Sequence, residues 1–152
     1  MRILVLSDSH GSRRKVDLAL LAQPKAEVVL HLGDGAGDLE YARFEHPDKA
    51  FFQVTGNCDY FGDFPVEDTI TIDGHKILFT HGHAYRVKYT MEQLLHHARD
   101  IGAEIVVFGH THRPETGYED GLYWMNPGAL KSGQYGFIDI TDKGIVTNLV
   151  TL

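Results

Sequence analysis

The chain has 152 residues, a formal net charge of −7 at pH 7 and a single cysteine. This length predicts one domain that spans residues 1–152, and the lone cysteine excludes an internal disulfide. The acidic balance argues against nonspecific nucleic-acid binding, which needs a basic surface. The first apolar run has only four residues, far below the about 20 that cross a membrane, so we expect a cytoplasmic protein with no membrane partner.

Short apolar runs recur along the chain, and each ends in polar residues. Continuous apolar runs of this length are typical of strands that are buried on both faces of an α/β sheet. The five runs cover residues 3–6, 28–30, 51–54, 77–80 and 105–108. Helices are predicted at residues 12–21, within residues 35–46 and at residues 91–101. Thr90 is the expected N-cap of the last helix, and Gly102 is its expected stop.

The second half adds a hairpin and three later strands. Asp73-Gly74 is a tight-turn pair that joins residues 69–72 to residues 76–80. Residues 113–121 are rich in turn formers and read as an active-site loop. The later strands are predicted as a meander at residues 122–125, 135–140 and 145–152. The fold class is therefore α/β, a layered sandwich whose first half alternates strand and helix in a parallel arrangement.

Side chains that bind metal ions follow the five apolar runs. In α/β folds ligands collect just beyond the carboxyl ends of the strands, so we expect these side chains to converge. They are two carboxylates, one amide and four imidazoles: Asp8, His10, Asp34, Asn57, His81, His110 and His112. Such mixed oxygen and nitrogen donors suit divalent Mn, Fe, Ni, Co or Zn, and the lack of a thiolate cage indicates a catalytic site. A single short polar motif of this kind is more often only a turn, but five such motifs, each after an apolar run, predict a two-metal hydrolase.

These blocks resemble the motifs of the calcineurin-like metallophosphoesterases, which are Asp-x-His, Gly-Asp, Gly-Asn-His-Glu/Asp, His and Gly-His-x-His. The short length is similar to that of the small bacterial and archaeal phosphodiesterases in this superfamily. The resemblance implies two mixed β-sheets flanked by helices. It also implies that Asp8, His10 and His112 hold one metal ion, that Asn57, His81 and His110 hold the other, and that Asp34 bridges both.

One position departs from the family motif. Where most members have His, this chain has Cys58 within Gly56-Asn57-Cys58-Asp59, a variant that the small subgroup also shows. The usual His is thought to donate a hydrogen bond or proton to the reacting phosphoryl group, and a thiol is a weaker donor. Asp59 is expected to orient this loop through hydrogen bonds. Ala129 likewise replaces the usual Ser in a late Asn-Pro-Gly-Ser loop.

The predicted reaction is the hydrolysis of a phosphoester, small molecule or nucleotide, with two divalent metal ions as cofactors and Mn as the first expectation. Ions about 3.5 to 4 Å apart would activate a bridging water for in-line attack on phosphorus. The residues assigned to catalysis are Asn57, Cys58, Asp59 and His81. A diester is favoured because its single charge needs less neutralisation. The alternative functions are a phosphomonoesterase or nucleotide phosphatase, and a protein-binding scaffold such as the retromer subunit of this fold. A homodimer or higher homo-oligomer is also expected.

Other candidate residues have two interpretations. His83 lies two residues after His81 and is a candidate phosphate contact. His31 is expected to be a buried strand residue, and a shared metal site at His96 and His97 is disfavoured because adjacent helical positions point in different directions. Aromatic side chains could line a pocket or pack a loop onto the sheet: Tyr60, Phe61, Phe64 and Tyr85.

Overall fold

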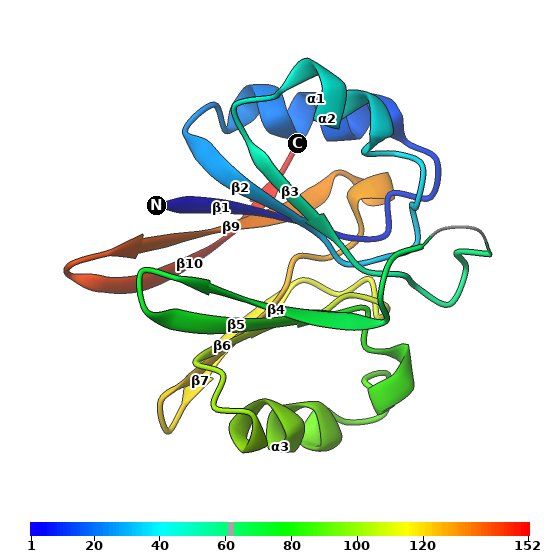
Figure 1. Cartoon of the computed structure of the whole chain (residues 1–152). Helices are drawn as coiled ribbons and strands as arrows, with labels where there is room; N and C mark the ends of the chain where they lie inside the picture. The colour runs from blue at the N-terminus through cyan, green and yellow to red at the C-terminus, as the bar shows by residue number, and fades with distance from the viewer. Residues whose placement is uncertain (61–62) are drawn as a thin grey trace.

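The computed structural model describes residues 1–60 and 63–152, so Phe61 lies outside the described residues. Two five-stranded mixed sheets face each other, with helices on their outer faces (Figure 1). This arrangement confirms the predicted α/β sandwich. No helix in the described part of the chain is long and apolar enough to cross a membrane.

The first sheet carries the parallel half of the fold. Its order is β10-β9-β1-β2-β3, with β1 to β3 parallel and β9 and β10 antiparallel. Helices α1 and α2 cover its outer face (Figure 1). The elements of this half are β1 (Arg2–Leu6), α1 (Arg13–Ala22), β2 (Ala26–His31), α2 (Glu40–Glu45), β3 (Ala50–Gln53), β9 (Gln134–Thr141) and β10 (Gly144–Thr151).

The second sheet has the order β4-β5-β6-β8-β7, with β5, β6 and β8 parallel and both outer strands antiparallel. Helix α3 covers its outer face (Figure 1). Its elements are β4 (Glu67–Ile72), β5 (His75–Thr80), the 3₁₀ turn η1 (His83–Tyr85), α3 (Glu92–Asp100), β6 (Ile105–Val107), β7 (Glu115–Glu119), β8 (Leu122–Asn126) and the 3₁₀ turn η2 (Leu130–Ser132).

The central strands are apolar throughout because both of their faces are buried. In β1, Ile3 and Val5 point into the core between the two sheets, while Leu4 and Leu6 pack under the helices. Successive side chains of a strand point to opposite faces, so a strand with helices on one side and a second sheet on the other has no exposed face. The same layering holds the ends of these strands at a common edge.

The hairpin prediction is confirmed. Asp73 and Gly74 join β4 to β5 with φ angles of 50° and 82°, both positive, as a tight two-residue hairpin turn requires. Helices α1 and α3 are present within two residues of the expected ends, and α2 lies within residues 35–46 as expected. Helix α3 begins at Glu92 with Met91 as its N-cap, so the predicted N-cap Thr90 is wrong by one residue, although the Thr90 hydroxyl accepts a hydrogen bond from Glu92 N at 3.2 Å.

The predicted meander is confirmed for its last two strands, which pair antiparallel as β9 and β10, and is wrong for its first strand. Strand β8 lies parallel to β6 in the second sheet, whereas β9 and β10 complete the first, so the chain crosses between the sheets after β8. The physical reason is burial, because Leu122 packs under α3 and Met125 packs between the sheets. An interior strand of the second sheet satisfies both of these side chains.

The predicted loop at residues 113–121 is also wrong, because it contains β7. This strand is polar and mostly exposed, so no apolar alternation marks it. Gly117 lies directly against Trp124 of β8, and a Cβ there would sit 2.0 Å from Trp124 Cζ2. The glycine that resembles a turn former therefore makes room for a ring on the neighbouring strand.

Candidate metal centre

The candidate site lies where loops from both sheets meet beyond the carboxyl ends of the parallel strands (Figure 1). Six of the seven expected ligand residues form two groups, and within each group one ligand atom per residue lies within 4.8 Å of the others. The first group contains Asp8, His10 and His112, and the second contains Asp34, His81 and His110.

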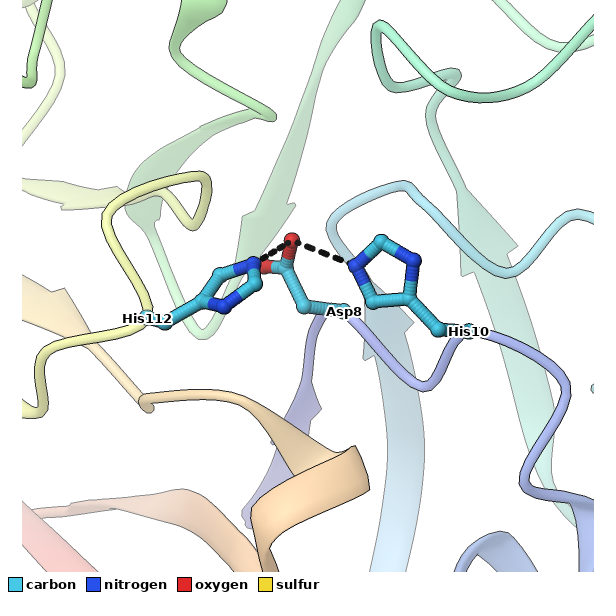
Figure 2. A group of neighbouring side chains, drawn as sticks. All are labelled: Asp8, His10 and His112. Carbon is cyan, nitrogen blue, oxygen red and sulfur yellow. Dashed lines mark hydrogen bonds and ion pairs between the residues drawn. The ribbon is translucent and has the colours of Figure 1, made fainter.

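The first group is built around one oxygen of Asp8. Asp8 Oδ1 lies 3.0 Å from His112 Nε2 and 3.5 Å from His10 Nε2, with the two rings on opposite sides of the carboxylate (Figure 2). The other oxygen, Oδ2, accepts hydrogen bonds from the Ser7 hydroxyl at 2.5 Å and from His110 N at 3.1 Å. The buried carboxylate is thereby held with one oxygen free to face the imidazoles.

The second group is built around His81, whose side chain is fully buried. His81 Nε2 lies 3.2 Å from both Asp34 Oδ2 and His110 Nδ1. The opposite ring nitrogen, Nδ1, donates to Leu32 O at 2.7 Å, which leaves Nε2 directed at the group. Such an outer hydrogen bond fixes the tautomer and ring orientation of a metal-binding histidine.

Asp34 lies between the two groups. Its Oδ2 is 3.2 Å from His81 Nε2 and 3.9 Å from His10 Nε2 of the first group, while Oδ1 accepts from Cys58 N at 2.8 Å. Burial acts to raise the pKa of Asp34, but the hydrogen bond and charge of His81 outweigh it and hold the pKa below its usual value. The group is a carboxylate in the position that a shared ligand would occupy.

The histidines of the second group titrate in opposite directions. Burial lowers the pKa of His110 to about 4, helped by the charges of His81 and Lys88, so its imidazole is neutral near pH 7. Burial also disfavours protonation of His81, but the hydrogen bond to Asp34 and the nearby carboxylates raise its pKa. A divalent cation would replace the proton that these carboxylates attract.

The backbone at the site is unusual. Five of the eight non-glycine residues with positive φ in the described chain are expected ligands: Asp8, His10, Asp34, His110 and His112. Such conformations are costly and cluster where the surrounding structure imposes them for function. Gly56 shows how close the loops are, because a Cβ there would lie 2.1 Å from Asp34 Oδ1. The turn-forming glycines of the motifs are thus needed for close packing.

Asp59 joins the loops that carry Asp34 and Asn57. Its carboxylate accepts hydrogen bonds from four backbone amides, at 2.8 Å from Asp34 N, 3.0 Å from Gly35 N, 3.0 Å from Ala36 N and 2.8 Å from Gly56 N. Asn57 and Cys58 lie on the exposed side of this loop, with Asn57 Nδ2 3.6 Å from Cys58 Sγ. Burial and the neighbouring carboxylates raise the pKa of the Cys58 thiol, so it stays protonated near neutral pH.

A buried network next to the first group was not predicted from the sequence. The Ser9 hydroxyl donates to Asp38 Oδ2 at 2.6 Å and lies 2.8 Å from His31 Nε2. Gly33 N donates to His31 Nδ1 at 3.2 Å, and burial lowers the pKa of His31 to about 4. His31 is therefore neutral, with its proton on Nε2 and donated to Ser9. The one signal in the sequence was Ser9 itself, between two expected ligands.

A second unpredicted support comes from Asn126. Its buried side-chain amide donates to Gly109 O at 3.0 Å and to Thr111 Oγ1 at 2.9 Å, which fixes the loop that carries His110 and His112. Just after it, Lys131 N donates to Asp8 O at 3.2 Å. The late Asn-Pro-Gly-Ala segment and the turn η2 after it therefore tie the last ligand loop to the first.

The remaining candidates are distributed as follows. The ring of His83 lies beside those of His81 and His110, whereas His96 and His97 pair separately with Asp100 and Glu67. His31 is buried in β2 as expected. Among the aromatic residues, Tyr60 is exposed, Tyr85 donates to Glu67, and Phe64 lines a cavity of about 470 Å³ beside Arg43.

Comparison with known proteins shows the family to which the chain belongs. Residues 1–142 match the calcineurin-like phosphoesterase superfamily domain, and the chain belongs to this family. It is 32% identical to the probable metallophosphoesterase YsnB of Bacillus subtilis over 86% of this chain and 76% of that protein. It is also 30% identical to vacuolar protein sorting-associated protein 29 of Schizosaccharomyces pombe over 100% of this chain and 84% of that protein.

The similarity extends to a named phosphodiesterase and to solved structures. The Escherichia coli phosphodiesterase YfcE is 26% identical over 91% of this chain and 88% of its own length. A predicted phosphoesterase from Streptococcus pneumoniae superposes with a TM-score of 0.82 at 25% identity, covering 99% of this chain and 88% of that one. An archaeal phosphodiesterase has the same fold, with a TM-score of 0.79, 22% identity and full coverage of both chains.

Proposed function

We propose that this protein is a phosphodiesterase that works with two divalent metal ions, with Mn²⁺ as the first candidate. The observation that carries the proposal is the pair of adjacent ligand groups with Asp34 between them. We assign Asp8, His10 and His112 to one ion, Asn57, His81 and His110 to the other, and Asp34 to both.

The donor chemistry fits such ions. When bound, two divalent ions lower the pKa of a water for attack on phosphorus and neutralise the phosphoryl oxygens. The chain supplies the geometry, because Asp8 and Asp34 each have one oxygen fixed by backbone or hydroxyl donors and the other directed at imidazoles. Carboxylate and neutral imidazole ligands are the set that Mn, Fe, Co, Ni and Zn accept. No protein nucleophile is needed for this reaction.

A diester is the favoured substrate class. A diester carries one negative charge near phosphorus and a monoester carries two, so the monoester needs more cationic or hydrogen-bonding groups around it. The Cys58 thiol, at the position where a stronger donor is usual, gives little such help. The similarity to YfcE, named as a phosphodiesterase, points the same way.

Metal analysis combined with an activity screen tests the proposal. Purified protein would be stripped with a chelator, reloaded with Mn, Ni, Co, Mg or Zn, and assayed on bis(4-nitrophenyl) phosphate and 4-nitrophenyl phosphate. We expect activity to disappear on chelation, to return with a transition metal, and to be greater on the diester. Diester hydrolysis that persists in metal-free protein would contradict the mechanism, and a faster monoester reaction would replace it with a phosphomonoesterase or nucleotide phosphatase.

A second candidate function is a non-catalytic binding protein, which the 30% identity to a vacuolar sorting protein across the whole chain favours. The presence of His or Asp at all six positions of the two ligand groups argues for catalysis instead. An Asp34→Asn variant separates the two functions. A binding protein would capture the same partners in a pull-down after this change, whereas an enzyme would lose its reaction.

A further inference from the structure

His83 lies against the second ligand group. Its ring centroid is 5.4 Å from that of His81 and 6.1 Å from that of His110. It is not itself one of the clustered ligand residues of the described chain. Its Nδ1 is buried and has no hydrogen-bond partner among the described residues. Buried polar atoms nearly always have a hydrogen-bond partner, so we expect this nitrogen to form a hydrogen bond with a ligand that binds at the site.

The turn that follows His81 is built to bring His83 back to this place. Gly82 has φ +101°, and a Cβ there would lie 2.8 Å from Val87 Cγ2, so both the backbone and the packing require glycine. Tyr85 N then donates to Gly82 O at 3.0 Å, which closes the turn η1. The backbone of this turn thus sets the position of the His83 ring beside His81 and His110.

A cluster on the far side of η1 anchors the turn. The Tyr85 hydroxyl donates to one oxygen of Glu67, and His97 Nε2 lies 2.8 Å from the other. The rings of Tyr85 and His97 stack with centroids 5.3 Å apart. Residues from β4 and α3 therefore fix η1 from two directions, which limits the movement of His83 relative to His81.

We propose that His83 is a catalytic residue that donates a hydrogen bond to the leaving oxygen of the phosphoester, a role in which the Cys58 thiol is weak. This inference rests on the proposed function. In the reaction, the water oxygen forms a bond to phosphorus and releases one proton to solvent, the bond from phosphorus to the leaving oxygen breaks, and that oxygen keeps the electron pair. The imidazole N–H stabilises the charge on it until solvent supplies a proton.

The test uses two methyl aryl phosphate diesters that differ only in the leaving group, 4-nitrophenol or the more basic phenol. A donor to the leaving oxygen helps the poorer leaving group more. We expect His83→Ala to lower kcat by about 100-fold on the phenyl ester and by about tenfold or less on the nitrophenyl ester. His83→Asn, which keeps an N–H donor near the position of Nδ1, should recover part of the loss on the phenyl ester.

A second site and a matched control sharpen this test. Adding Cys58→His to His83→Ala should restore part of the phenyl ester rate by placing a donor in the loop whose backbone binds Asp34 Oδ1. His96→Ala removes an exposed imidazole on α3 and should leave both rates unchanged. Metal content is measured on every preparation and should stay the same. An equal fall on both esters, or loss of a metal ion in His83→Ala, would overturn the role.

Phosphate binding separates failure of this inference from failure of the proposed function. If the wild-type protein hydrolyses neither diester, the proposed function has failed, and calorimetric titration of the metal-loaded protein with inorganic phosphate still tests His83. We expect His83→Ala to weaken phosphate binding by about tenfold, which is the worth of one hydrogen bond to a charged group. Equal phosphate affinity of the wild type and His83→Ala would refute the contact.

Discussion

The two ligand groups of the candidate metal centre differ in how far their side chains are buried and fixed by hydrogen bonds. In the second group, the Asp34 and His81 side chains are 3% and 0% exposed, and each has a further atom fixed by a hydrogen bond to the backbone. In the first group, the imidazoles of His10 and His112 are 28% and 35% exposed and are held mainly against Asp8. Preorganised ligands lose less freedom when they bind, so the two metal positions should differ in affinity.

The strongest test of this comparison removes the residue that joins the groups. Asp34→Asn is expected to lower diester hydrolysis by more than about 100-fold. Asp8→Asn should cost less, because Asp34 serves both ions and its loss disturbs their spacing. Rates and metal content would be measured for both variants. Retention of both metal ions and of the rate in Asp34→Asn would show that the bridge is wrongly assigned.

Metal titration sharpens the comparison directly. We expect two binding steps whose affinities differ by about tenfold to 100-fold, with the buried second group filling first. His10→Ala should remove the weaker step and leave the tighter one. Calorimetry with Mn²⁺ on chelator-treated protein would resolve the steps, and loss of the tighter step in His10→Ala would reverse the order proposed here.

Changes at Ser9 test whether metal binding by the first group depends on the buried hydrogen bonds among Ser9, Asp38 and His31. Ser9→Ala breaks the contacts of the hydroxyl with Asp38 and His31, and it should weaken the lower-affinity step by about tenfold. Ser9→Thr keeps the hydroxyl and is the matched control, with little change expected. The same metal titration measures both variants, and an unchanged lower-affinity step in Ser9→Ala would rule out this supporting role.

Cys58 should show the smallest effect, because it is exposed and is a member of neither ligand group. Cys58→Ala is expected to keep both ions and to lower the diester rate by less than about tenfold. Cys58→His should raise the ratio of monoester to diester activity by adding a stronger donor. A parallel fall of both activities in Cys58→His, or loss of an ion in Cys58→Ala, would indicate a packing role instead.

Much of the candidate site could be predicted, because the type of each side chain and its position after a strand are local properties. Asp8, Asp34 and His81 each follow a buried apolar strand, and parallel strands deliver their ends to one edge. The buried hydrogen-bond network beside these residues could not be predicted in this way. Ser9, His31 and Asp38 meet only because β1 pairs with β2 and the following loops fold together, which no local pattern encodes.

The same limit applies to the later strands. Sequence proximity favours pairing of β8 with β9, but pairing is decided by which sheet can bury both faces of β8. That is a property of the assembled layers. Strand β7 is missed for the opposite reason, because its mostly exposed residues carry no apolar pattern at all.

The position of β9 beside β1 has a consequence for biosynthesis. Strand β1, which leads into Asp8, pairs on one side with β2 but on the other with residues 136–139, so its second neighbour leaves the ribosome more than a hundred residues later. Until then one edge of β1 stays open, and the crossing that ties Leu130 N to Ser7 O has not formed. Pairing of segments so distant in the chain slows folding. The nascent chain therefore completes the candidate metal centre only after β9 has been synthesised.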